Sequence, residues 1–195
     1  MFKYIINKIC GFSGLLLPII PTIIFIIAIL ENQWFSWTKN AISDLGRANA
    51  SPYLFNNGLI FIGILMLVFS IGLIINFKEK LGPTIILMCS FLLMLIGVFP
   101  VTHILHEPIS MSFFISFSVG FLVIGHTFYK DNFPSFIIGI KILALIVVVS
   151  AVFAFIFFIF YNWTAVAEIL VIYPGFIWCM IYSISLIRTD YSFRD

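Results

Sequence analysis

Long apolar runs constrain the fold of this chain more than any other feature of its sequence. Residues 142–160 read ILALIVVVSAVFAFIFFIF, without one charged side chain. A helix needs about 20 apolar residues to cross the hydrocarbon core of a bilayer, and this run has about that length. Its residues do not alternate between apolar and polar, as those of a membrane barrel strand would. The run therefore predicts a membrane-spanning helix.

Further runs of the same kind occur along the chain, and polar segments separate them. Neither an internal repeat nor a low-complexity linker divides the sequence, so residues 1–195 are expected to form one domain. The sequence therefore predicts an all-α, polytopic membrane protein with six transmembrane helices in a single bundle. The expected spans are 9–30, 54–76, 82–102, 109–129, 134–160 and 165–187.

The share of charged residues agrees with this fold class. A soluble domain carries about 25% charged residues, and this chain carries 9%. Its net charge of +2 is too small to indicate a nucleic-acid partner. The cysteines, Cys10, Cys89 and Cys179, lie in or beside the apolar runs. Their odd number and scattered positions favour packing over a disulfide framework or a zinc knuckle.

Prolines mark the starts and the expected kinks of the spans. Those expected in the first turn of a helix, where a missing N–H costs least, are Pro52, Pro83, Pro108 and Pro134. Those expected to kink a span, because they remove a hydrogen bond inside it, are Pro18, Pro21, Pro100 and Pro174.

Basic residues predict the orientation of the spans, because cytoplasmic loops carry an excess of Lys and Arg. With a cytoplasmic N-terminus, the inner side holds Lys3, Lys8, Lys78, Lys80, Lys130, Lys141, Arg188 and Arg194. The outer side then holds Lys39 and Arg47. We therefore expect a cell-membrane protein with both termini in the cytoplasm. An outer aromatic belt is expected from Trp34, Trp37, Tyr53, Tyr161 and Trp163.

The segment VFPVTHILHEPIS, residues 98–110, places two histidines between two apolar runs. His103 and His106 would share one face of a continued helix, a spacing that allows both to bind one metal ion. A catalytic zinc needs a third protein ligand, for which Asp44, Glu107 and Glu168 are the candidates. Two alternatives stay open: the histidines hydrogen-bond loop carbonyls at the membrane surface, or they transfer protons or contact a head group.

Glu168 lies nearly one turn inside the last expected span. A carboxylate at that depth needs a partner in protein or water. Arg47 is the expected partner, because a planar guanidinium suits a partly buried carboxylate. The pair would serve either a functional site or the anchoring of the first outer loop. The Asn56 amide, which opens the second span, either binds a ligand or satisfies the backbone of that loop.

Several segments of the sequence resemble one family of membrane proteins. They are KICGFSGLLLPII, AISDLGRANASPYLFNNGLIFIGILM, GVFPVTHILHEPIS and AVAEILVIYPGFIW. Over almost the whole chain they resemble the domain-of-unknown-function 998 family of mostly archaeal six-span proteins. The positions that carry the resemblance are Ser43, Leu45, Gly46, Phe55, Asn56, Gly97, Phe99, Pro100, His106 and Glu168. His103 is not a clear part of this pattern, which weakens the two-histidine metal hypothesis.

A more distant similarity is to the Frag and DRAM type of eukaryotic six-span proteins, whose first loop also carries a Ser-Asp-x-Gly element. Some members of that group are linked to lipid remodelling or lipid distribution. The similarity implies a lipid-related role on the outer face, and it supplies no catalytic mechanism.

The leading functional hypothesis is an outward-facing site that binds a membrane-lipid head group or a similar ligand. Its predicted residues are Asp44, Arg47, Asn56, His106 and Glu168. One alternative is an intramembrane hydrolase with zinc on His103 and His106. Others are a transporter, which the scarcity of ionisable residues in mid-span argues against, and a structural subunit that binds another membrane protein or a second copy. Whether the protein is an enzyme stays open.

Overall fold

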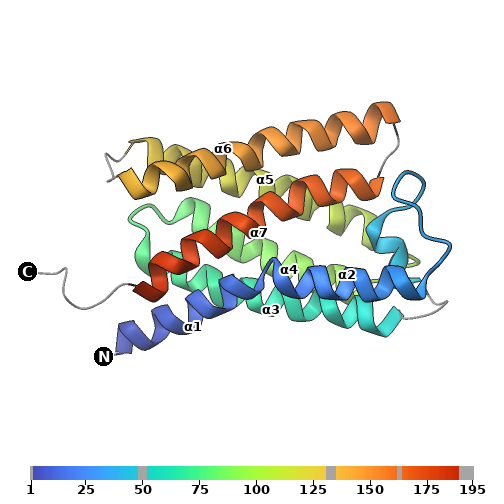
Figure 1. Ribbon diagram of the computed structural model, residues 1–195, viewed down its shortest axis with the longest axis horizontal. Helices are drawn as coiled ribbons and strands as arrows, with labels where there is room; N and C mark the ends of the chain where they lie inside the picture. Colours follow the sequence, from blue (N-terminus) through green and yellow to red (C-terminus); the bar gives the residue numbers. More distant parts are fainter. Residues whose placement is uncertain (1, 48–51, 131–134, 162–163, 189–195) are drawn as a thin grey trace, which may run out of the picture.

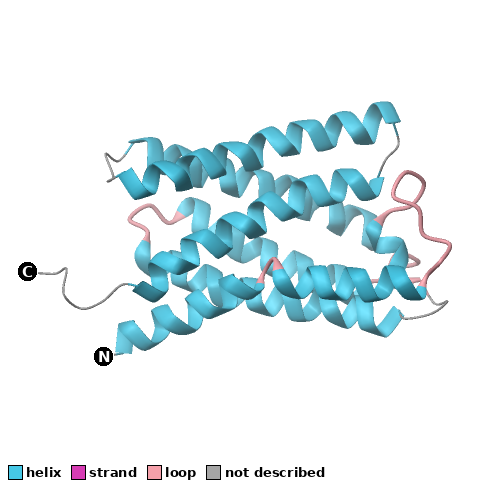
Figure 2. Ribbon diagram, in the orientation of Figure 1, coloured by secondary structure: helices cyan, strands magenta, loops and turns pink. Residues whose placement is uncertain are grey.

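The protein is a bundle of long helices. The computed structural model describes residues 2–47, 52–130, 135–161 and 164–188, with the side chains of 128–144 and 161 excepted. The described residues form helices and no strand (Figures 1 and 2). The elements are α1 (Phe2–Leu16), α2 (Ile19–Glu31), the 3₁₀ turn η1 (Ile42–Gly46), α3 (Pro52–Asn76), α4 (Leu81–Val98), α5 (His106–Lys130), α6 (Ser135–Ile156), the π-helical turn η2 (Phe157–Tyr161) and α7 (Thr164–Arg188).

The helices have the length and composition of membrane spans. Among the described residues, five helical segments are long and apolar enough to cross a bilayer, and α1 with α2 count as one of them. The apolar stretch Leu145–Phe160 belongs to a further helix, formed by α6 and η2. The predicted fold class, an all-α polytopic membrane bundle, is therefore confirmed.

Some helix ends differ from the expected spans. The first helix begins at Phe2 rather than at residue 9, because long Lys side chains can reach water from inside a span. The helix expected to run to residue 102 ends at Val98, since Pro100 cannot continue it. The next helix begins at His106 rather than at residue 109, which places Pro108 in its first turn.

The first span is broken where its proline predicts. The helix α1 ends at Leu16 and α2 begins at Ile19, so the break contains Pro18. The Thr22 hydroxyl lies 2.7 Å from the carbonyl oxygen of Pro18 and 2.9 Å from the Tyr173 hydroxyl of α7. These bonds satisfy polar groups at a depth where no water is available to them.

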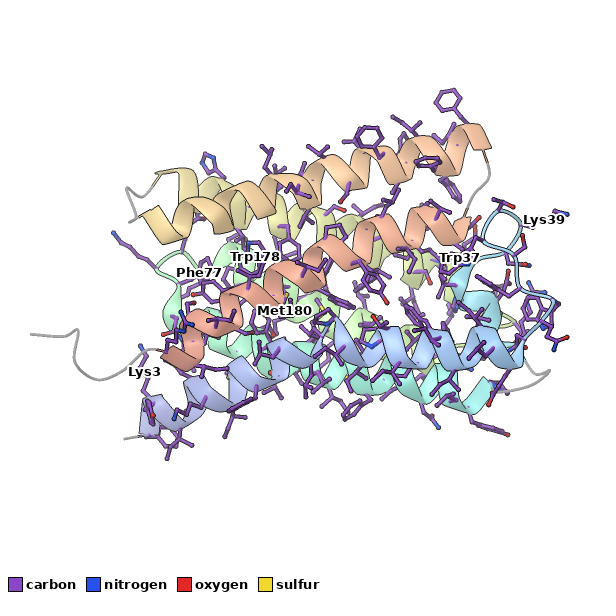
Figure 3. All side chains as sticks on the ribbon, in the orientation of Figure 1. Lys3, Trp37, Lys39, Phe77, Trp178 and Met180 are labelled. Carbon is purple, nitrogen blue, oxygen red and sulfur yellow. The ribbon has the colours of Figure 1, made fainter. Side chains whose placement is uncertain are left out.

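The helices form a closed ring in which each packs against the next. The order is α1, α3, α4, α5, α6, α7 and back to α1, while α2 continues α1 along α3 (Figure 1). Aromatic rings fill the space between α5 and α7. The ring centroids of Phe117 and Phe121 are 4.9 Å apart, those of Phe121 and Trp178 are 5.2 Å apart, and Trp178 stacks on Tyr182. Figure 3 shows Trp178 among the helices.

The two ends of the bundle differ in character. The start of α1 and the end of α7 share one end, the terminal end (Figure 1). The opposite end, the loop end, carries residues 32–47. Lys3 marks the terminal end and Lys39 the loop end in Figure 3. The three cysteines are free and buried in the bundle.

Candidate functional site

The loop of residues 32–47 lies across the loop end and is bound to the start of α7. The backbone N–H of Ala165 donates to the carbonyl oxygen of Asn40 at 3.0 Å. In return, the backbone N–H of Ile42 donates to Oε2 of Glu168 at 2.5 Å. The first N–H groups of a helix have no partner within the helix. The loop thus provides an acceptor for an N–H group at the start of α7. In turn, α7 provides an acceptor for the N–H group at the start of η1.

Asp44 organises the turn η1 from within. Its Oδ2 accepts a hydrogen bond from the backbone N–H of Ala41 at 2.9 Å. Its Oδ1 lies 2.9 Å from Nε of Arg47. The side chain of Asp44 is 14% exposed and that of Arg47 is 55% exposed. Asp44 therefore binds one edge of the Arg47 guanidinium group while the Arg47 side chain as a whole stays more than half exposed.

Asn56 joins η1 to the first turn of α3. Its Nδ2 donates to the carbonyl oxygen of Gly46 at 3.1 Å. A Cβ atom at Gly46 would lie 2.4 Å from Oδ1 of Asn56, so any other residue at this position would displace the Asn56 amide. The glycine of the Ser-Asp-Leu-Gly segment thus permits the loop to approach α3. We call η1 with Arg47, Asn56 and Glu168 the cap.

His103 lies in the turn between α4 and α5, and His106 is the first residue of α5. Nδ1 of His106 lies 2.8 Å from the carbonyl oxygen of Phe99, and His106 is 6% exposed. Nδ1 of His103 accepts the backbone N–H of Leu105 at 3.1 Å, and its ring packs on Phe99 with a centroid distance of 4.7 Å. The expected shared helix face is wrong, because α5 begins only at His106. Both rings instead bond to the backbone of their own turn.

A catalytic zinc does not suit this arrangement. Within the ranges that the structure describes, no group of three or more His, Cys, Asp and Glu residues could hold a metal ion. A catalytic zinc takes three protein ligands, and His103 and His106 supply two.

The ion pair expected between Arg47 and Glu168 is also wrong. Arg47 pairs with Asp44, three residues before it, and Glu168 bonds to the loop backbone instead. The cap thus brings together Asp44, Arg47, Asn56 and Glu168, whereas His106 serves the neighbouring turn. Sequence reasoning did not identify the backbone groups of Asn40 and Ile42, because any residue type carries such groups.

Exposed aromatic side chains lie at the same end of the bundle as the cap. Trp34, Trp37 and Tyr53 are 44%, 45% and 82% exposed, and Figure 3 shows Trp37 at the loop end. Exposed Trp and Tyr are typical of the level of lipid head groups. Trp163 and the Tyr161 side chain, also expected in this belt, lie outside the described residues.

The comparison with protein families identifies one match. The model of the family described as "Protein of unknown function (DUF998)" matches residues 15–185. Neither the curated proteins nor the solved structures gave a significant match. The positions that carry the resemblance include the junctions described above: Gly46 with Asn56, Phe99 with His106, and Glu168 with the loop. The family model matches most of this chain, which is a bundle of membrane-spanning helices, and the chain therefore belongs to the DUF998 family.

Proposed function

We propose that this integral membrane protein binds the anionic head group of a membrane lipid at its cap. One observation carries the proposal. Asp44 holds the Arg47 guanidinium through Nε, while more than half of the Arg47 side chain stays exposed. A guanidinium group binds phosphate through paired hydrogen bonds, and one fixed in advance loses less freedom on binding.

The other residues of the cap hold Arg47 in place. Asn56 and Glu168 bond to the backbone on either side of Asp44, at Gly46 and at Ile42. These bonds hold η1 in place, and η1 contains Asp44, the acidic partner of Arg47. The exposed Trp34, Trp37 and Tyr53 are residue types enriched at the level of the head groups, which supports this depth for Arg47. In this proposal Arg47 contacts the lipid, and Asp44, Asn56 and Glu168 position it.

Replacing Arg47 by glutamine should remove a preference for anionic lipid. Charge-assisted hydrogen bonds contribute about 1.5–3 kcal/mol, so we expect affinity to fall about tenfold or more. The measurement is native mass spectrometry of the protein with phosphatidylglycerol and with phosphatidylcholine. Lys39→Gln is the matched control, because it removes an equal charge from the same loop at an exposed position. Equal losses in both variants would show unspecific attraction and contradict the proposal.

We further propose that the loop end faces outward from the cell membrane. Among residues with described side chains, Lys3, Lys8, Lys78, Lys80 and Arg188 belong to the terminal end, while Lys39 and Arg47 belong to the loop end. Lys130, Lys141 and Arg194 lie outside the described side chains. This distribution supports a cytoplasmic terminal end.

A labelling experiment in intact cells tests the orientation. A membrane-impermeant maleimide should react with a Lys39→Cys variant and leave a Lys78→Cys variant unlabelled until the cells are opened. Both positions are exposed, and the native cysteines are buried, so they contribute little background. The reverse pattern would place the cap in the cytoplasm.

A further inference from the structure

A groove between α6 and α7 lies apart from the cap. It encloses about 310 Å³, and its lining is formed by Leu145, Ile146, Val149, Ser150, Phe153, Phe157 and Leu170. A cavity that holds one water molecule needs about 10–15 Å³ of such space, so the groove is far larger than an ordinary packing void. Leu170 follows Glu168 by two residues, which places the two side chains on nearly opposite faces of α7. The groove is therefore separate from the lipid head-group site proposed above.

The lining offers no polar recognition. Ser150 is the one polar residue among the lining side chains, and its hydroxyl donates to the carbonyl oxygen of Val147 in its own helix at 2.8 Å. Every other lining residue is aliphatic or aromatic. A ligand with polar groups would lose its hydrogen bonds to water without replacement. The groove is suited to a purely apolar occupant.

The backbone changes its helical form at one end of the groove. The π-helical turn η2 begins at Phe157, which is also a lining residue. Such turns are rare and are frequent at functional sites. From Leu145 in α6 to Phe157 at the start of η2, the lining side chains follow one stripe about 18 Å long. This length is close to half of the ~30 Å hydrocarbon thickness, the depth of one leaflet.

We propose that the groove holds one hydrocarbon chain of a membrane lipid. Leu145, Val149 and Phe153 are 63%, 45% and 53% exposed, so the groove is continuous with the surface that the bilayer covers. A chain of one leaflet has the length of the stripe and needs no polar partner. The site depends on chain shape and not on head-group charge, and it goes beyond the role proposed for Arg47.

Photolabelling in liposomes tests this site. The probe is diacylglycerol with a diazirine in its chain, whose uncharged head group carries no phosphate and so makes the result independent of Arg47. After illumination, peptide mapping should find severalfold more label on residues 145–157 and 170 than on Ile115 and Leu122. Those two residues of α5 are 60% and 54% exposed and serve as an ordinary lipid-facing surface. Equal labelling of both regions would overturn the proposal.

A pair of variants gives a second comparison. Val149→Trp should fill the groove and reduce its labelling to the level of α5. Val119→Trp adds the same ring to α5 at a side chain of similar exposure, 43% against 45%, and should leave the groove labelling unchanged. Groove labelling that persists in Val149→Trp would contradict the site. Groove labelling below that of α5, with cross-links between copies of the chain, would assign the groove to a protein interface and also overturn it.

Discussion

A Gly97→Ala variant is expected to lose about 1–3 kcal/mol of unfolding free energy, the usual effect of adding a methyl group to a well-packed interior. Its Cβ atom would lie 2.5 Å from the backbone carbonyl oxygen of Asn56 and 3.1 Å from the backbone nitrogen of Ile60. Backbone atoms inside a helix cannot rotate away as a side chain can. The end of α4 must therefore separate from the first turns of α3, which also carry the Asn56 amide of the cap. Equilibrium unfolding in mixed micelles measures the change.

Gly120→Ala is the matched control for this substitution. Its Cβ atom would also be crowded, at 2.7 Å, but by Cδ1 at the far end of the Ile86 side chain, which can rotate. Both variants gain the same helix propensity from alanine, so the difference between them isolates the contact with the backbone of α3. If the two variants were equally stable, close approach of α3 and α4 would not limit packing at this end.

The helices could be predicted from the sequence because bilayer thickness sets their length and no soluble alternative exists for such runs. Pro18 predicted the break between α1 and α2 for an equally local reason. The end of α4 and the start of α5 were harder to predict from the sequence. Pro100 was expected to kink a helix, but it follows the last residue of α4, and the turn to His106 then uses side chains to satisfy backbone groups.

The cap was predicted only in part. Asp44, Arg47, Asn56 and Glu168 were grouped correctly at one end, since the topology of the spans brings their segments together. Their pairing was not predictable from charge alone. Asp44 lies one turn before Arg47 and competes successfully for the guanidinium, which leaves Glu168 to a backbone donor. Backbone donors carry no signature in a sequence, so the bonds of Asn40 and Ile42 could be found only in the fold.

Replacing Glu168 by alanine should release the loop from α7. The variant leaves the Ile42 N–H, and with it the start of η1, without an acceptor. An unsatisfied buried donor costs about 1–3 kcal/mol. We expect hydrogen exchange of residues 41–46 to rise strongly while the spans stay protected. Glu168→Gln keeps a carbonyl oxygen at the same place and should show a smaller rise.

Glu31→Ala provides the control at the same end of the bundle. Glu31 is the exposed last residue of α2, so its removal should change neither the exchange of the loop nor the binding of anionic lipid. Glu168→Ala should reduce lipid preference as well, because Arg47 is held by Asp44, which lies in the released turn. Exchange unchanged in Glu168→Ala would show that Asn56 and the Asn40 carbonyl suffice to hold the loop. If hydrogen exchange rises but the preference for anionic lipid is unchanged, Arg47 does not bind the lipid, and Glu168 only anchors the loop to α7.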